Sequence, residues 1–385
     1  MLTVGIVANE PSGDLLGAAL LREIRVRVPE VRLVGVAGPR MQDAGCESLF
    51  PLERLSVMGL VEVLRHLRGL LRIRGDLTRY FLRLRPDVFI GVDAPDFNLG
   101  LEKRLRAAGI PTVHLVSPTV WAWRPGRVKQ IRRAVDLMLS IFPFEVDFLN
   151  EHQVPVRYIG HPLADEIPFG LDRGAARAAL GLEGSGRLVA VLPGSRASEV
   201  RSLAAPFLRT ARLCHERHPD LRFAIPLVNP SLSTLVRDVL AREAPEVPIL
   251  LVEGRSREVI AASDCVLTAS GTATLESLLV GRPMVVGYRI DRLTYRLIKG
   301  LRLVKVPYAA MANLLVGREL APELIQERCR PELLAPAVLE LLEQPERVGE
   351  ILDTYAHVHR QLRQNAGREA AKAVLELIGA PAAGP

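Results

Sequence analysis

The sequence has few aromatic residues, few cysteines and no long apolar segment, and each shortage excludes a class of protein. Aromatic residues make up 5% of the chain against 49% hydrophobic residues, so its cores are aliphatic. No apolar run reaches the roughly 18 residues of a membrane-spanning helix. The first residues, Met1–Ala8, lack the basic region of a signal peptide and predict a strand. The four cysteines have no C-x-x-C spacing, which favours free thiols in a reducing cytoplasm over disulfides or zinc.

Two signatures of cofactor and metal chemistry are also missing. The first strand–helix turn lacks the G-x-G-x-x-G spacing of a dinucleotide site. The chain has no Asp-x-Asp pair to hold Mg²⁺ or Mn²⁺ against a diphosphate, so we expect no metal and no cofactor. The formal net charge of +7 indicates an anionic partner, such as a nucleotide or a phospholipid surface. No recognition helix or RNP-type motif is present, so we expect no nucleic acid partner.

Short apolar runs alternate with segments of helical spacing along all 385 residues, which predicts an α/β architecture with two cores. We expect a first domain over 1–168, a second over 187–348 and a C-terminal helical segment over 349–385. The main expected strands are 2–9, 31–37, 87–92, 112–116, 188–193, 223–228, 249–252, 265–267 and 284–286.

The most informative stretch is Asp264–Tyr288, in which a strand breaks at Ala269-Ser-Gly-Thr and a helix follows up to Gly281. A turn of small residues leaves backbone N–H groups free at the positive end of the helix dipole, where a phosphate can bind. Glu276, one turn inside the helix, could accept hydrogen bonds from a ribose. The alternative is an ordinary strand–helix unit in which Ser270 or Thr272 is the N-cap.

Three further strand ends carry polar turns. Ser12 lies in Glu10-Pro-Ser-Gly-Asp14, which is either a nucleotide-binding turn or a capped first loop. Arg196, in Gly194-Ser-Arg196, could pair with a diphosphate or form a salt bridge with Glu199.

Asp93 follows the buried strand 87–92, at the end of a parallel sheet where ligands bind. Because Asp96 or Asn98 can cap the next helix, Asp93 has no evident structural duty. The alternative is a loop carboxylate bonded to local backbone. Trp121 and Trp123 could stack on a ligand or anchor the packing.

Residues 60–85 form a basic amphipathic segment. Arg65, Arg68 and Arg72 share one face if the segment is helical, although Gly69 and Gly75 predict two shorter pieces. Each arginine near an anionic surface adds about 1 kcal/mol, which predicts docking on an anionic membrane surface. The alternative is a core helix with solvated arginines.

Taken in order, these segments resemble the lipid A disaccharide synthases, a family of glycosyltransferases, nearly from end to end. Asn9 and Ala312 depart from the family, which usually has glycine and proline there. The matching motifs are Glu10-Pro-Ser-Gly-Asp-Leu-Leu-Gly17, Gly35-Val-Ala-Gly-Pro-Arg-Met41, Val57-Met-Gly-Leu-Val-Glu-Val63, Asp93-Ala-Pro-Asp-Phe-Asn98, Val116-Ser-Pro-Thr-Val-Trp-Ala-Trp123, Leu192-Pro-Gly-Ser-Arg196, Ala269-Ser-Gly-Thr-Ala-Thr-Leu-Glu276, Met284-Val-Val-Gly-Tyr288 and Asn313-Leu-Leu.

The resemblance implies a GT-B fold, in which two Rossmann-like domains face each other across a cleft. It implies an inverting transfer that joins UDP-2,3-diacylglucosamine to 2,3-diacylglucosamine 1-phosphate and gives a β-1,6-linked disaccharide and UDP. Asp93 matches the family's proposed general base, and Arg196 would stabilise charge on the leaving UDP. The residues expected to contact the UDP-sugar are Glu10, Ser12, Gly194, Ser195, Ser270, Gly271, Thr272, Glu276 and Asn313.

Because both implied substrates carry two acyl chains, the expected location is cytoplasmic, peripherally associated with the inner face of the cytoplasmic membrane. The resemblance leaves a homodimer open. Two alternatives are another GT-B enzyme that uses a UDP-sugar, such as a UDP-N-acetylglucosamine 2-epimerase, and a non-enzymatic nucleotide-sugar binding protein.

Overall fold

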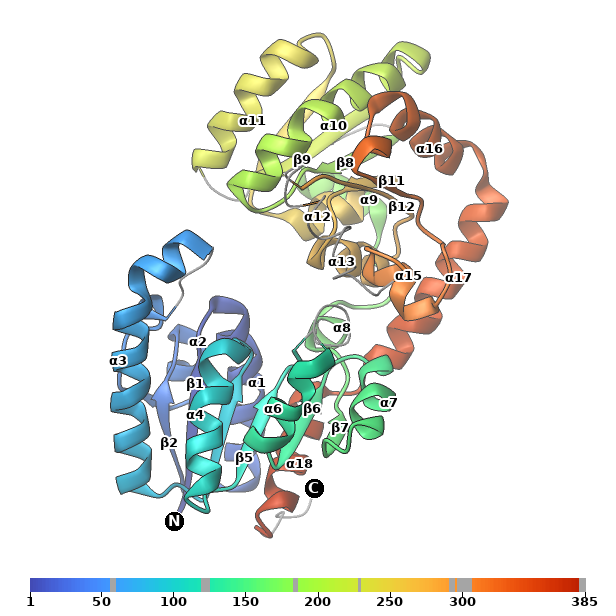
Figure 1. Cartoon of the computed structure of the whole chain (residues 1–385). Helices are drawn as coiled ribbons and strands as arrows, with labels where there is room; N and C mark the ends of the chain where they lie inside the picture. Colours follow the sequence, from blue (N-terminus) through green and yellow to red (C-terminus); the bar gives the residue numbers. More distant parts are fainter. Residues whose placement is uncertain are drawn as a thin grey trace. The chain divides into compact units, whose positions relative to one another are not determined.

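The computed structural model describes residues 1–55, 60–118, 125–182, 186–227, 230–290, 295 and 307–380, with backbone alone for 60–66 and 125. Trp121 and Trp123 lie outside the described residues. The chain divides into two compact units, Met1–Asp165 with Leu362–Pro385, and Glu166–Gln361. In each unit, helices cover a parallel β-sheet (Figure 1).

The first unit contains a seven-stranded sheet in the order β3-β2-β1-β4-β5-β6-β7, and all its neighbouring strands are parallel. Its strands are β1 (Leu2–Ala8), β2 (Val31–Val36), β3 (Cys46–Ser48), β4 (Val88–Val92), β5 (Thr112–Leu115), β6 (Leu137–Ser140) and β7 (Val156–Tyr158). Its helices are α1 (Pro11–Arg27), α2 (Pro39–Asp43), η1 (Leu52–Arg54), α3 (Leu60–Leu84), α4 (Pro95–Ala107), η2 (Pro125–Arg127), α6 (Val128–Ala134), α7 (Phe144–Glu151), α8 (Pro162–Glu166, ending at the unit boundary) and α18 (Ala366–Leu377).

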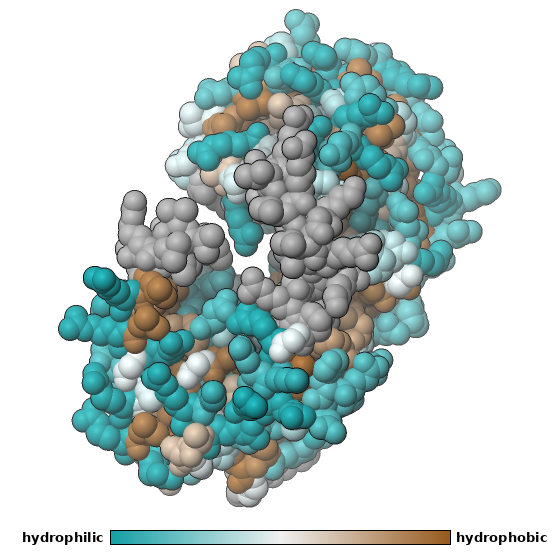
Figure 2. Space-filling view, in the orientation of Figure 1, coloured by the Kyte–Doolittle hydropathy of each residue, from teal (hydrophilic) through white to brown (hydrophobic). Residues whose placement is uncertain are grey.

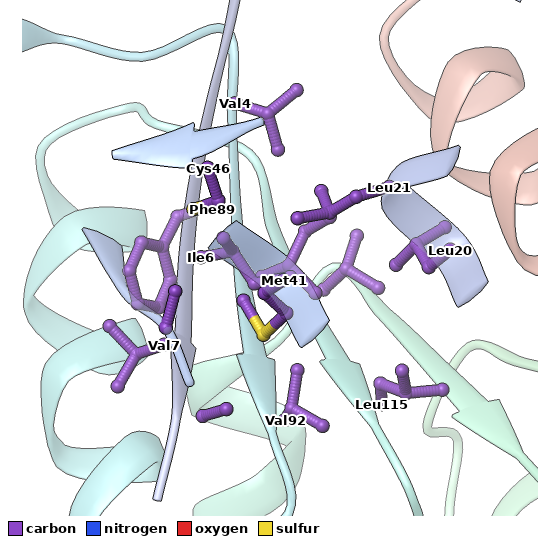
Figure 3. Close-up of a cluster of buried hydrophobic side chains, with 14 of the residues drawn as sticks. Val4, Ile6, Val7, Leu20, Leu21, Met41, Cys46, Phe89, Val92 and Leu115 are labelled. Carbon is purple, nitrogen blue, oxygen red and sulfur yellow. The ribbon is translucent and has the colours of Figure 1, made fainter. Parts of the chain in front are cut away.

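The core of the first unit is aliphatic with a few phenylalanines, as the composition predicts. Ile6 of β1, Phe89 of β4 and Leu21 of α1 are fully buried and lie in one cluster (Figure 3). The strands carry runs of buried residues because helices cover both faces of a parallel sheet.

The second unit contains a six-stranded parallel sheet in the order β10-β9-β8-β11-β12-β13. Its strands are β8 (Leu188–Leu192), β9 (Arg222–Leu227), β10 (Ile249–Glu253), β11 (Cys265–Thr268), β12 (Met284–Tyr288) and β13 (Glu323–Ile325). Its helices are α9 (Arg173–Ala179), α10 (Ala197–Arg217), α11 (Pro230–Glu243), α12 (Ser256–Ala262), α13 (Thr272–Val280), α15 (Met311–Val316), η3 (Gln326–Arg328), α16 (Pro331–Glu343) and α17 (Pro345–Leu362, whose last residue is assigned to the first unit).

Both sheets have the strand order of a Rossmann fold, so the α/β expectation is confirmed. The order reverses between β1 and β4 in the first unit and between β8 and β11 in the second. In open parallel sheets, ligands bind at this reversal, outside the carboxyl ends of the strands. We therefore expect a ligand site at the turns that follow these four strands.

Two features differ from the sequence-based expectation. Residues 60–84 form one continuous helix, not two pieces separated by Gly69 and Gly75. The segment 349–385 does not form a single C-terminal helical part. Its first helix, α17, lies almost entirely in the second unit, whereas α18 belongs to the first. There α18 packs against α1, and Gly367 lies so close to Ala19 that an added Cβ would approach the Ala19 carbonyl oxygen to 3.0 Å.

Candidate active site

In the first unit, the turn after β4 holds Asp93 by its backbone and leaves its carboxylate without a partner among the described residues. The Asp93 N–H donates to the carbonyl of Leu115 (2.8 Å), and Asn98 Nδ2 donates to the Asp93 carbonyl (2.8 Å). Asp93 and Ala94 both have left-handed backbone, with φ of +52° and +43°. Two such non-glycine residues in succession are strained, and strain of this kind gathers at functional sites.

Neither residue expected to cap α4 does so. The N-cap is Ala94, with no side-chain cap. Asp96 instead pairs with Arg127, and Asn98 is fully buried and turned inward. The alternative reading of Asp93, a carboxylate bonded to local backbone, therefore has no support among the described contacts.

Glu10 and Ser12 belong to the neighbouring turn, after β1 of the same sheet. Glu10 is the N-cap of α1, and Ser12 is exposed in the first turn of that helix. Asp14 is buried and accepts hydrogen bonds from the N–H groups of Arg40 and Met41 (both 3.0 Å), so it caps α2. Glu10 and Ser12 thus lie on the unit that carries Asp93, whereas the other residues expected to contact the UDP-sugar belong to the second unit.

In the second unit, the turns after β8 and β11 line a cavity of about 470 Å³. It brings together seven residues predicted from the sequence, and Glu199, Tyr288 and Ser256 join them. The predicted residues are Gly194, Ser195, Arg196, Ser270, Gly271, Thr272 and Glu276.

The N-terminus of α13 opens into this cavity without a side-chain cap. Gly271, with φ of +130°, is the N-cap, a conformation that an L side chain rarely adopts. The Ser270 hydroxyl does not cap the helix but donates to the carbonyl of Ala309 (2.8 Å). The alternative of Ser270 or Thr272 as N-cap is therefore wrong. The first N–H groups of α13 have the geometry of an anion site.

Arg196 precedes α10, and its side chain is 66% exposed at the cavity. The alternative salt bridge with Glu199 is present, but its closest N···O distance is 3.9 Å. Glu199 is engaged chiefly with backbone, because its Oε2 accepts from the N–H groups of Ser195 (3.1 Å) and Arg196 (3.3 Å). A loose exposed ion pair is worth little, so the Arg196 guanidinium can pair with an anion in the cavity.

Gly194 is required at this turn. Its φ is +121°, and an added Cβ would lie 2.6 Å from the Cβ of Glu199. Only glycine therefore allows Glu199 to reach back and fix the backbone that presents Arg196.

Glu276 lies one turn into α13 and is half-buried. Burial raises the pKa of its carboxyl; Arg257 opposes this shift in pKa, and Glu166 adds to it. Burial and the nearby Glu199 likewise raise the pKa of the Tyr288 hydroxyl. The cavity thus combines a helix N-terminus and an arginine with the partly buried carboxyl of Glu276 and phenol of Tyr288.

Asn313 is not among the residues lining the cavity. It is fully buried, its Nδ2 donates to Ala321 and Glu323, and its Oδ1 accepts from the N–H groups of Leu320 and Ala321. In this structure Asn313 holds a loop together, and its amide has no capacity left for a ligand.

The basic segment α3 has two different halves. Ile73, Leu77 and Phe81 are buried in the core cluster of the first unit, whereas Leu67 and Leu71 are 41% and 47% exposed. Arg68 and Arg72 are exposed beside those leucines, and the side chain of Arg65 lies outside the described residues. Figure 2 shows hydrophobic surface along α3, at the left edge of the view. Across the described residues, every helix is too short or too polar to cross a membrane.

Sequence reasoning missed Tyr288, Glu199 and Ser256. Tyr288 could have been found, because it ends the strand next to β11 and parallel neighbours end at the same edge. Glu199 appeared only as the salt-bridge partner of Arg196, and its capping role depends on the φ of Gly194. Ser256 follows β10, the edge strand of the sheet, and carries no local signal.

The chain is similar to known proteins in both sequence and structure. A family model described as lipid-A-disaccharide synthetase matches residues 4–377. The chain is 51% identical over 376 residues to the lipid-A-disaccharide synthase of Erwinia tasmaniensis, covering 98% of each.

Solved structures share the architecture at low identity. A UDP-GlcNAc 2-epimerase from Neisseria meningitidis bound to UDP-GlcNAc superposes with a TM-score of 0.62 at 13% identity, over 97% of this chain and 99% of that one. A glycotransferase of kitacinnamycin gives 0.64 at 19% identity, over 97% and 98%. These likenesses show the GT-B fold alone and do not favour the epimerase alternative. With half of its residues identical to a curated synthase along almost its whole length, the chain belongs to the lipid-A-disaccharide synthase family of glycosyltransferases.

Proposed function

We propose that this enzyme joins UDP-2,3-diacylglucosamine to 2,3-diacylglucosamine 1-phosphate, with Asp93 as the general base and the cavity of the second unit as the UDP site. The observation that carries the assignment is the pairing of an uncapped helix N-terminus with an exposed arginine in one cavity, since a diphosphate needs both kinds of donor. Glu276, one turn further along α13, would accept hydrogen bonds from the ribose hydroxyls.

The chemistry needs one displacement. The 6-hydroxyl oxygen of the acceptor attacks the anomeric carbon of the donor sugar, the bond from that carbon to the diphosphate breaks, and UDP leaves. Asp93 takes the hydroxyl proton, and its backbone-held turn keeps the carboxylate in place for that step. Arg196 and the α13 N–H groups stabilise the charge that develops on the diphosphate. We also propose that Glu10 and Ser12, in the turn after β1, contact the UDP-sugar.

The test is an assay of Asp93→Asn and Arg196→Ala with both diacylated substrates, read by mass spectrometry. We expect Asp93→Asn to lose about 10²–10⁴-fold in kcat, the usual effect of a general base, and to retain UDP binding by calorimetry. Arg196→Ala should lose about 10²–10³-fold in kcat, the scale for one charge-stabilising group, and should also weaken UDP binding. Either variant keeping more than about a tenth of wild-type kcat would remove its assigned role.

We further propose that the enzyme docks on an anionic membrane through the exposed half of α3. Two-chain substrates rarely leave a bilayer, because burial of acyl chains is worth about 0.8 kcal/mol per CH₂. Arg68 and Arg72 would bind acidic headgroups, while Leu67 and Leu71 would enter the interface.

Docking is measured by co-sedimentation with liposomes that contain phosphatidylglycerol. Arg68→Ser with Arg72→Ser should reduce binding and its dependence on salt, and Leu67→Ser with Leu71→Ser should reduce the salt-resistant part. A double change of exposed arginines in the second unit, Arg201→Ser with Arg217→Ser, is the matched control. Equal binding by all three doubles would place the docking surface elsewhere.

A further inference from the structure

We infer that Glu323, which is not among the residues lining the cavity, is a positioning residue that fixes the N-terminus of α13 for the nucleotide. The inference rests on the proposed role of the cavity as the UDP site. It follows from a chain of hydrogen bonds between β13, the N-terminal turn of α15 with its cap (residues 309–313) and the start of α13.

The first link is the Glu323 carboxylate, which accepts three hydrogen bonds from one turn. Its Oε2 accepts from the Ala309 N–H (2.8 Å), and its Oε1 accepts from the Ala310 N–H (2.9 Å) and from Asn313 Nδ2 (2.8 Å). A carboxylate accepts only, so it matches these three donors fully. Asn313 is itself locked to residues 320–321, so the turn is held from both sides.

The second link runs from the turn to the cavity. The Ser270 hydroxyl donates to the carbonyl of Ala309 (2.8 Å), and the Met311 N–H donates to Thr274 Oγ1 (3.1 Å). Thr274 Oγ1 donates in turn to the carbonyl of Gly271 (2.8 Å). The residues on both sides of Gly271 are thus tied to the same turn.

Ala309 is the point at which the two links meet. Its N–H is held by Glu323, and its carbonyl is held by Ser270. A shift of the Ala309 backbone should therefore also shift Ser270, the residue next to the N-cap of α13.

These hydrogen bonds take the place of the side-chain cap that α13 lacks. Gly271 has no side chain to hold its own helix terminus, so the direction of the first N–H groups depends on the hydroxyls of Ser270 and Thr274. Donors that are fixed before the ligand arrives need no reorganisation when it binds. Glu323 supplies that rigidity from outside the cavity.

The test is Glu323→Gln, with UDP binding measured by calorimetry on the full chain. The amide keeps the size of the side chain, but one of its two terminal atoms becomes an NH₂ group that cannot accept, so at least one turn N–H loses its partner. We expect the Kd for UDP and the KM for the UDP-sugar to rise about tenfold, the scale for one lost hydrogen bond, with a smaller change in kcat. Glu327→Gln, which removes the same charge from an exposed position on the following turn, should bind UDP as the wild type does.

A double-variant cycle separates positioning from general loss of stability. If Glu323 acts through Ser270, Glu323→Gln with Ser270→Ala should weaken UDP binding by less than the product of the two single effects. Fully multiplicative effects, or a folded Glu323→Gln with wild-type affinity, would overturn the inference. If Glu323→Gln does not fold, Thr274→Val decides, since it removes the acceptor of the Met311 N–H; unchanged affinity would count against the inference. A wild-type chain that does not bind UDP would instead refute the proposed function of the cavity.

Discussion

Among single residues, two neighbours with strained backbone lie where the chemistry is proposed. Asp93 and Ala94 are consecutive non-glycine residues with positive φ, and such conformations cost about 1–3 kcal/mol each. Asn98 and the Leu115 carbonyl hold the turn in this state. The strain is therefore maintained by a buried amide and a neighbouring strand, and it fixes where the Asp93 carboxylate can point.

We expect Ala94→Gly to separate stability from activity. Glycine adopts positive φ without steric cost, so the free energy of unfolding should rise by about 0.5–1 kcal/mol. The same freedom should loosen Asp93 and lower kcat several-fold. Urea unfolding and the transfer assay measure the two effects. A more stable variant with full kcat would mean that the strained turn is not needed to place Asp93.

Among the secondary-structure elements, α3 shows how packing overrides local propensity. Two glycines predict a break, because each costs about 1 kcal/mol in a helix interior relative to alanine. The helix continues because Ile73, Leu77 and Phe81, spaced four residues apart, are buried on both sides of Gly75. Tertiary burial of that stripe outweighs the local cost.

Gly75→Ala should therefore stabilise the protein. An added Cβ at Gly75 would meet nothing within 4 Å, so the gain in helix propensity of about 0.5–1 kcal/mol should appear in full. Thermal unfolding measures it, with liposome binding as a second readout that should not change. A decrease in melting temperature would show that the helix bends at this glycine in solution.

The connection before α8 should make stability depend on pH. His161 is 8% exposed, its Nδ1 accepts from the Leu163 N–H (3.2 Å), and burial lowers its pKa to about 4. The unfolded chain, with an ordinary pKa of 6.5, takes up the proton first. The free energy of unfolding should therefore fall by up to about 3 kcal/mol from pH 6.5 to pH 4, with no contribution above pH 6.5.

The comparison is urea unfolding of the wild type and His161→Asn at pH 7 and pH 4.5. Asparagine can accept from the Leu163 N–H but does not titrate in this range. The wild type should lose more stability than the variant on acidification. Equal losses would assign the acid sensitivity to other groups.

The sequence predicted most strands to within one or two residues and identified the turns that line the cavity. Those signals are local, since an apolar run followed by small residues specifies a strand and its turn. Asn313 shows what local signals cannot predict, namely the hydrogen-bond partners of a buried side chain. Its position in a family motif indicated a ligand contact, but its amide is consumed by residues 320–323, and only tertiary structure brings those groups together. The uncapped start of α4 was missed because Asn98 turns inward to the Asp93 carbonyl.

At the scale of the whole molecule, the first unit is built from two separate stretches of the chain. The first unit is completed by α18, whose Ala370, Ala371 and Val374 lie in the same buried cluster as residues of α1 and β1. The chain therefore leaves the first unit, forms the second and then returns. No local signal in the sequence distinguishes this return from an independent C-terminal segment.

Two glycine substitutions should change stability in opposite directions, because only Gly367 lies where α18 packs on α1. Gly367→Leu would drive a side chain into the Ala19 carbonyl on α1 and should lower the melting temperature of the first unit. Gly349→Leu, in the interior of α17 with open space around it, should raise stability by about 0.5–1 kcal/mol. Calorimetry with limited proteolysis identifies which unit unfolds. An unchanged melting temperature for Gly367→Leu would mean that α18 is not docked on α1 in solution.

The return of α18 to the first unit also has a consequence during synthesis. Proteins usually fold from the N-terminus as they leave the ribosome, at about 5–20 residues per second. Here the first sheet emerges early, yet the helix that covers α1 is translated only after residues 166–361. For tens of seconds, roughly, the nascent first unit presents the apolar face of α1 uncovered. Because transiently exposed apolar surface favours aggregation, we expect the nascent chain to need chaperone protection until α18 is synthesised and packs on α1.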